Sequence, residues 1–133
     1  MTEELKELAF NAWSQKYSYL IKKKSDEKSI LKAIELICEN KIDLMSNIKS
    51  RKPEFVCARR LYMFIMYLHF GVKVQIVADK FGMTRANIYH HCHYIFDQYD
   101  VDMEFRIKMS MFFTKDYMIE LRERLSKVER KRK

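Results

Sequence analysis

The stretch "VADKFGMTRANIYHHCHYI", Val77 to Ile95, decides the fold predicted for this chain. A helix-turn-helix needs a small residue where its two helices cross, a residue tolerant of positive φ in the turn, and a branched apolar residue that anchors the second helix. Ala78, Gly82 and Ile88 supply these three features in the spacing A-x3-G-x5-I. The stretch therefore predicts two helices that pack across a tight turn.

The start of the second helix carries the residues that could contact the bases of DNA. Thr84 can cap this helix, because its hydroxyl can accept a hydrogen bond from a backbone N–H of the first turn. Arg85, Asn87 and Tyr89 would then lie near the exposed N-terminal end, where recognition helices touch base edges. A tight corner between two helices that never meets DNA has the same pattern, so both interpretations stay open at this point.

The composition of the whole chain favours an all-α fold. The 133 residues are 48% hydrophobic but include only 2 glycines and 1 proline, which leaves few residues suited to hairpin turns. This length allows one domain, or a small domain with helical extensions. The net charge of +8 and the pI near 9.4 place an excess of basic side chains on the surface, so a polyanion is the expected partner.

Apolar spacing predicts helices on both sides of the central stretch. Helices are expected at about 2–21, 26–40, 53–70 and 73–81, with Ile76, Val77 and Phe81 of the last one facing inward. Residues 102–111 alternate apolar and polar as a strand would, but no second strand is available to pair with them, so a helix is expected there too. Beyond Thr114, a last helix is expected to fray into the basic end.

Basic residues gather in two segments. Residues 41–60 contain six basic side chains against two acidic ones, a local balance of +4, and residues 120–133 contain seven against three, again +4. Residues 97–104 are acidic, and phosphates would avoid them. Nucleic acid is therefore expected to meet the middle of the chain and its tail, although charged runs more commonly form solvated helix faces.

A longer stretch, "SRKPEFVCARRLYMFIMYL" from Ser50 to Leu68, followed by the helix-turn-helix, resembles the C-terminal DNA-binding domain of the bacterial replication initiator DnaA, of the Trp-repressor-like type. The family's basic loop, following helix, I-G-x-x-F-G segment and recognition helix appear here as "SRK", "ARRLYMFI", "VADKFG" and "TRANIYHHC". The likeness covers about residues 30–96. It implies a DNA-binding domain at 30–100, with helical extensions at 1–29 and 101–133.

The resemblance also implies roles for individual residues. Arg59 would enter the minor groove, and the positions facing the major groove would be Thr84, Arg85, Ala86 and Asn87. Phosphates would be held by Ser50, Arg51 and Lys52, with the charge of Lys49 beside them. His90 and Cys92 match the family's "LHAC". Because Thr-Arg replaces the family's Asp-His pair, the base preference is expected to differ from that of the family.

Several activities are not expected. No G-x-x-x-x-G-K-[ST] loop is present, so the chain should bind no nucleotide and lacks the ATPase that accompanies this domain in the initiator. One helix carrying "HHCH" offers at most two metal ligands on one face, and no nucleophile, base and orienting group form a recognisable catalytic set. We therefore expect no metal, no cofactor and no enzymatic activity, but a stand-alone reader of duplex DNA in replication initiation or regulation, such as a phage or mobile element uses.

The cellular location and further partners of the chain can also be predicted. The acidic N-terminus lacks an apolar signal region, and the apolar run Leu61 to Leu68 is too short to span a bilayer, so a cytoplasmic protein without a membrane partner is expected. The cysteines at 38, 57 and 92 are expected to be reduced and mostly buried. A rival interpretation is a helical protein-interaction module that uses a surface rich in methionine and aromatic residues, with DNA binding lost or secondary. A homodimer or contacts to other replication or regulatory proteins are compatible with either interpretation.

Overall fold

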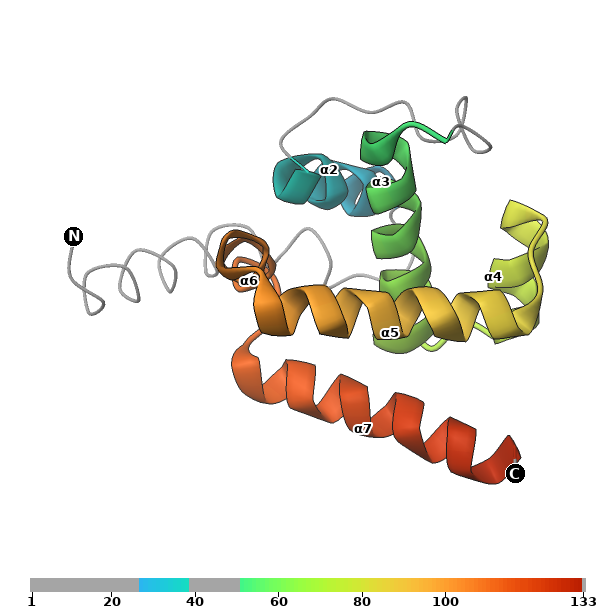
Figure 1. Ribbon diagram of the computed structural model, residues 1–133. Helices are drawn as coiled ribbons and strands as arrows, with labels where there is room; N and C mark the ends of the chain where they lie inside the picture. The colour runs from blue at the N-terminus through green and yellow to red at the C-terminus, as the bar shows by residue number, and fades with distance from the viewer. Residues whose placement is uncertain (1–26, 39–50, 133) are drawn as a thin grey trace, which may run out of the picture.

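The computed structural model describes residues 27–38 and 51–132, and the remaining residues are drawn as a grey trace in Figure 1. Within the described part, every regular element is a helix and there is no strand. The all-α prediction is therefore confirmed for these residues. The helix expected at 2–21 and the candidate phosphate contacts Lys49 and Ser50 lie outside the described residues.

From residue 53 onward, the helices follow one another with short connections between them (Figure 1). None of the helices in the described part is both long and apolar enough to cross a bilayer. In chain order they are α2 (Glu27–Cys38), α3 (Pro53–Phe64), the π-helical turn η2 (Ile65–His69), α4 (Val74–Phe81), α5 (Arg85–Val101), α6 (Met103–Met109) and α7 (Lys115–Arg132).

The helix predicted at 53–70 exists, but its last turn is wider than an α-helix. Pro53 occupies the first turn of α3, where its missing N–H costs no hydrogen bond. From Ile65 the backbone continues as η2, and the N–H of Phe70 donates to the Ile65 carbonyl at 3.0 Å, a five-residue step. Gly71, with φ of 70°, then ends the helix, as its position in the sequence predicted.

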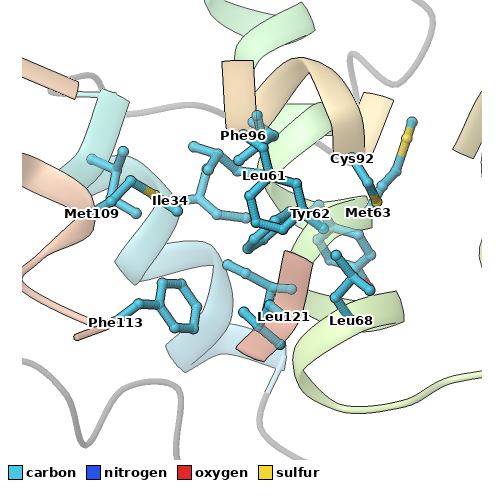
Figure 2. Packing of buried hydrophobic residues seen from close by; sticks show 14 of the residues in the cluster. Ile34, Leu61, Tyr62, Met63, Leu68, Cys92, Phe96, Met109, Phe113 and Leu121 are labelled. Carbon is cyan, nitrogen blue, oxygen red and sulfur yellow. The ribbon is translucent and has the colours of Figure 1, made fainter. Parts of the chain in front are cut away.

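A single hydrophobic core joins all the described helices (Figure 2). The ring of Phe64 on α3 stands edge-on to Phe96 of α5 and to Phe113, with centroids 5.2 and 6.1 Å away. Leu121 of α7 and Met109 of α6 are fully buried in the same cluster. The C-terminal helices α6 and α7, expected as an extension, thus share one core with α4 and α5.

Helix α7 runs antiparallel to α5, alongside it (Figure 1). Arg122 pairs with Asp100 near the end of α5 at 2.7 Å, and Glu129 pairs with His93 nearer its start. The helix continues to Arg132, beyond the point where fraying was expected. The basic end of α7 is therefore directed toward the N-terminal half of α5.

Two other expectations about local structure have clear outcomes. Residues 103–109, within the stretch that alternates like a strand, form α6, and the side chain of Asp102 caps it by accepting from the N–H of Phe105 at 3.2 Å. By contrast, the inward placement of Ile76 is wrong, because 59% of this residue is exposed. The buried face of α4 is formed by Val77, Ala78 and Phe81, and Ile76 lies to one side of it.

Candidate nucleic-acid interface

The turn between α4 and α5 has the geometry that the sequence predicted. Gly82 adopts φ of 64° and ψ of 37°, in the left-handed region. Its N–H donates to the carbonyl of Asp79 at 3.3 Å, and the N–H of Met83 donates to that of Ala78 at 2.9 Å. This pair of bonds is the Schellman arrangement, which satisfies the last carbonyls of a helix and reverses the chain.

The second helix begins where it was expected to begin. Thr84 is extended, and its hydroxyl accepts a hydrogen bond from the N–H of Asn87 at 3.2 Å. Ala78 on α4 and Ile88 on α5 are both fully buried, which lets the two helices approach closely. The cap and the anchor together fix the direction in which the first turns of α5 point.

The start of α5 presents polar side chains without acidic ones. Its first turn holds no acidic residue, and the first carboxylate along the helix is Asp97. Burying these polar side chains would carry a free-energy cost of desolvation, but they remain in contact with solvent. The exposed residues in this part of the structure are Thr84, Arg85, Ala86, Asn87 and His90.

Tyr89 does not belong to this exposed surface, so its expected placement at the exposed end is wrong. Only 8% of Tyr89 is exposed, and its ring packs edge-on to Tyr67 with centroids 5.7 Å apart. The spacing of Tyr89, Cys92 and Phe96 could have revealed this, because residues three and four apart share one helix face. All three side chains lie on the buried side of α5.

Arg59, the residue expected to enter the minor groove, is largely enclosed. It is 8% exposed, and burial, followed by the nearby charge of Arg60, lowers its pKa. Arginine remains protonated in proteins, so a buried guanidinium carries a desolvation cost. Its neighbour Arg60 is only half-buried.

Arg60 is a candidate contact that sequence reasoning did not single out. Its guanidinium carbon lies 3.7 Å from the centroid of the Tyr94 ring, and its Nε donates to Nδ1 of His91 at 3.2 Å. Burial, then the charges of Arg60, His90 and Arg59, lower the pKa of His91, which keeps Nδ1 free to accept this bond. The basic cluster in the sequence included Arg60, but no local pattern revealed which helix it would meet.

The basic entry to α3 adds positive charge to the candidate interface. Arg51 and Lys52 are both exposed, and Lys52 occupies the N-cap position of α3. The carbonyl of Lys52 accepts hydrogen bonds from the N–H groups of Phe55 and Val56, both at 3.0 Å. These bonds anchor the backbone of the basic segment at its junction with the helix.

The four side chains of "HHCH" diverge. His90 is exposed, His91 accepts from Arg60, Cys92 is buried and His93 pairs with Glu129 of α7. Throughout the segments that the structure describes, no group of three or more potential ligands is arranged to hold a metal ion.

Comparison with known proteins gives no relative: no protein-family model, no curated protein and no solved structure matches the chain. The function is therefore argued from the residues and from their geometry.

Proposed function

We propose that this chain binds double-stranded DNA through a helix-turn-helix formed by α4 and α5. The observation that carries the proposal is the exposed N-terminal end of α5, which is aimed by the Gly82 turn and the Thr84 cap and carries no acidic side chain in its first turn. A major groove admits an α-helix, and a recognition helix contacts bases with its N-terminal residues.

Each exposed residue of α5 has a chemical role in this proposal. Arg85 can donate two hydrogen bonds to guanine, and Asn87 can pair with the edge of adenine. Thr84, Ala86 and His90 border these two and would contact the flanking bases or sugars. Tyr89 supports the helix from inside, because it is buried against Tyr67.

Phosphate contacts would hold the helix in register. Arg51 and Lys52 are exposed at the start of α3, and Lys49 and Ser50 precede them in the sequence. Arg60 joins this set, because its guanidinium is held in place over the Tyr94 ring and by the hydrogen bond to His91. The resemblance to DnaA assigns the minor-groove contact to Arg59, but exposure favours Arg60 as the arginine presented to DNA.

The process remains the one implied by the resemblance to the initiator family. We propose a stand-alone reader that acts in replication initiation or in regulation, without nucleotide binding, since the chain contains no phosphate-binding loop of the G-x-x-x-x-G-K-[ST] type. Such a protein would mark a site on DNA and leave strand separation to other factors.

The rival interaction-module interpretation gains little from the methionines. Among the described methionines, Met63, Met109, Met111 and Met118 are buried, and only Met103 is exposed. These residues therefore fill the core, where flexible thioethers adapt to irregular gaps. Met66 and Met83 are partly buried and pack against the same core.

The decisive experiment is selection of bound duplexes from a random pool, followed by affinity measurements on the selected and on scrambled duplexes over a series of salt concentrations. We expect enrichment of a defined sequence, and an affinity that declines steeply with salt because each phosphate contact releases counterions. Removal of residues 131–133 should weaken binding to both duplexes alike. Absence of binding at low salt would refute the proposal.

A further inference from the structure

Two cysteines that are distant in the sequence meet at the junction of α2 and α3. The Sγ of Cys38, the last residue of α2, lies 3.7 Å from the Sγ of Cys57 in α3 and donates a hydrogen bond to it. Nineteen positions separate them in the chain. Both are free thiols and both are partly exposed, whereas Cys92 is fully buried.

The surroundings of the pair favour a thiolate at Cys57. The hydrogen bond donated by Cys38 lowers the pKa of Cys57 to about 7, against the opposing effect of burial, and the charges of Arg60 and Lys108 lower it further. The same hydrogen bond, together with burial and the charge on Cys57, raises the pKa of Cys38. These shifts favour a nucleophilic thiolate at Cys57 and a protonated thiol at Cys38.

Cys92 lacks all of these features. It is completely buried on α5, and burial alone raises its pKa to about 12. Reactive cysteines occupy electropositive, partly exposed surroundings, while buried cysteines in apolar surroundings are inert. Cys92 therefore serves as an internal control for the pair of Cys38 and Cys57.

We propose that Cys38 and Cys57 form a reversible dithiol–disulfide site whose oxidant is a hydroperoxide. The Cys57 thiolate attacks one peroxide oxygen, the O–O bond breaks, and the departing oxygen takes up a proton, leaving a sulfenic acid on Cys57. Cys38 then attacks that sulfur, its proton leaves with the hydroxide as water, and the S–S bond forms. Two electrons pass from the two sulfurs to the peroxide, and a dithiol reductant returns them when the site is reset.

The geometry requires only a short approach of the two sulfur atoms. A disulfide bond is about 2.05 Å long, so the sulfurs must move together from their present 3.7 Å. Rotation of the two side chains, combined with a small shift of α2 relative to α3, can supply this movement. The resulting cross-link would join α2 to α3 covalently.

The test is peptide mapping by mass spectrometry of the full chain after treatment with a small excess of hydrogen peroxide. We expect a peptide pair linked through Cys38 and Cys57, lighter by two hydrogen atoms, which a dithiol reductant reverses. Cys92→Ser should form the same link, as the matched control. Cys38→Ser should instead accumulate a sulfenic acid on Cys57 that a dimedone probe captures.

Two further measurements make the outcome decisive. Circular dichroism of the reduced variants and of wild type shows whether each variant is folded. The peptide map of the wild type identifies the linked pair without any substitution. The oxidised wild type should melt at a higher temperature than the reduced form, because a cross-link restricts the unfolded chain. The proposal is overturned if Cys57 stays a free thiol under peroxide that oxidises free glutathione, or if Cys57 pairs only between molecules. None of these results depends on DNA binding.

Discussion

The guanidinium of Arg60 on α3 lies over the ring of Tyr94 on α5, with 3.7 Å between the guanidinium carbon and the ring centroid. Tyr94 follows the exposed His90 by one helical turn, so the arginine extends the polar surface of α5 sideways. A cation held over an aromatic ring loses less freedom when it binds an anion than a mobile side chain does. This contact turns a residue of the supporting helix into a part of the candidate interface.

Replacing Arg60 should therefore weaken binding to DNA more than replacing an equally charged residue elsewhere. We expect Arg60→Ala to cost roughly 1–2 kcal/mol on every duplex, because a charge-assisted phosphate contact is lost. Lys115→Ala changes the net charge by the same amount at an exposed position on α7 and should have a smaller effect. Fluorescence anisotropy with one labelled duplex measures both, and equal losses would remove Arg60 from the interface.

Arg85 should determine which bases are preferred. Arg85→Ala is expected to cost about 1–3 kcal/mol on the selected site and to relax the choice at one or two base pairs. Lys52→Ala should weaken binding to all duplexes about equally, because phosphate contacts carry no sequence information. Competition between selected and random duplexes measures the two effects. Parallel losses on both duplexes for both variants would show that the start of α5 does not read bases.

A substitution at Gly82 should destabilise the turn through backbone strain and not through a steric clash. A Cβ added there would meet nothing within 4 Å, yet φ is 64°, where a β-branched residue is strained. Gly82→Val should lower the free energy of unfolding by about 1 kcal/mol or more. Gly82→Asn should lose less, because asparagine tolerates the left-handed region. Urea denaturation compares the three proteins, and a Val variant as stable as wild type would contradict the turn.

His91 should make stability depend on pH. Burial, together with neighbouring positive charges, holds its pKa below the ordinary 6.5 in the folded state. As the pH decreases through 6.5, His91 becomes protonated in the unfolded chain but stays neutral in the folded chain. The free energy of unfolding therefore decreases until the pH falls below the lowered pKa. Above 6.5 the residue is neutral in both states and contributes no slope.

The matched variant for this prediction is His91→Gln, which keeps a hydrogen-bond acceptor near Arg60 but cannot be protonated. Chemical denaturation at several pH values between about 7.5 and 5 should show a smaller loss of stability in the variant than in wild type. Identical pH profiles would mean that folding does not lower the pKa of His91.

The sequence alone determined the corner between α4 and α5, because that corner depends on residues close together in the chain. The left-handed turn at Gly82, the cap by Thr84 and the buried anchors Ala78 and Ile88 are all fixed by local backbone geometry and by apolar spacing. The helical state of 103–109 also followed from the sequence, because no partner strand was available.

Only the tertiary structure decided which side chains meet between helices. The stacking of Arg60 on Tyr94 depends on how α3 packs against α5. The edge-on contact of Tyr67 with Tyr89 depends in the same way on how η2 lies relative to α5. The contact between Cys38 and Cys57 likewise depends on how α2 packs against α3. Packing of this kind is set by many weak apolar contacts acting together and by the wider π-helical turn after Phe64, and neither leaves a periodic signal in the sequence.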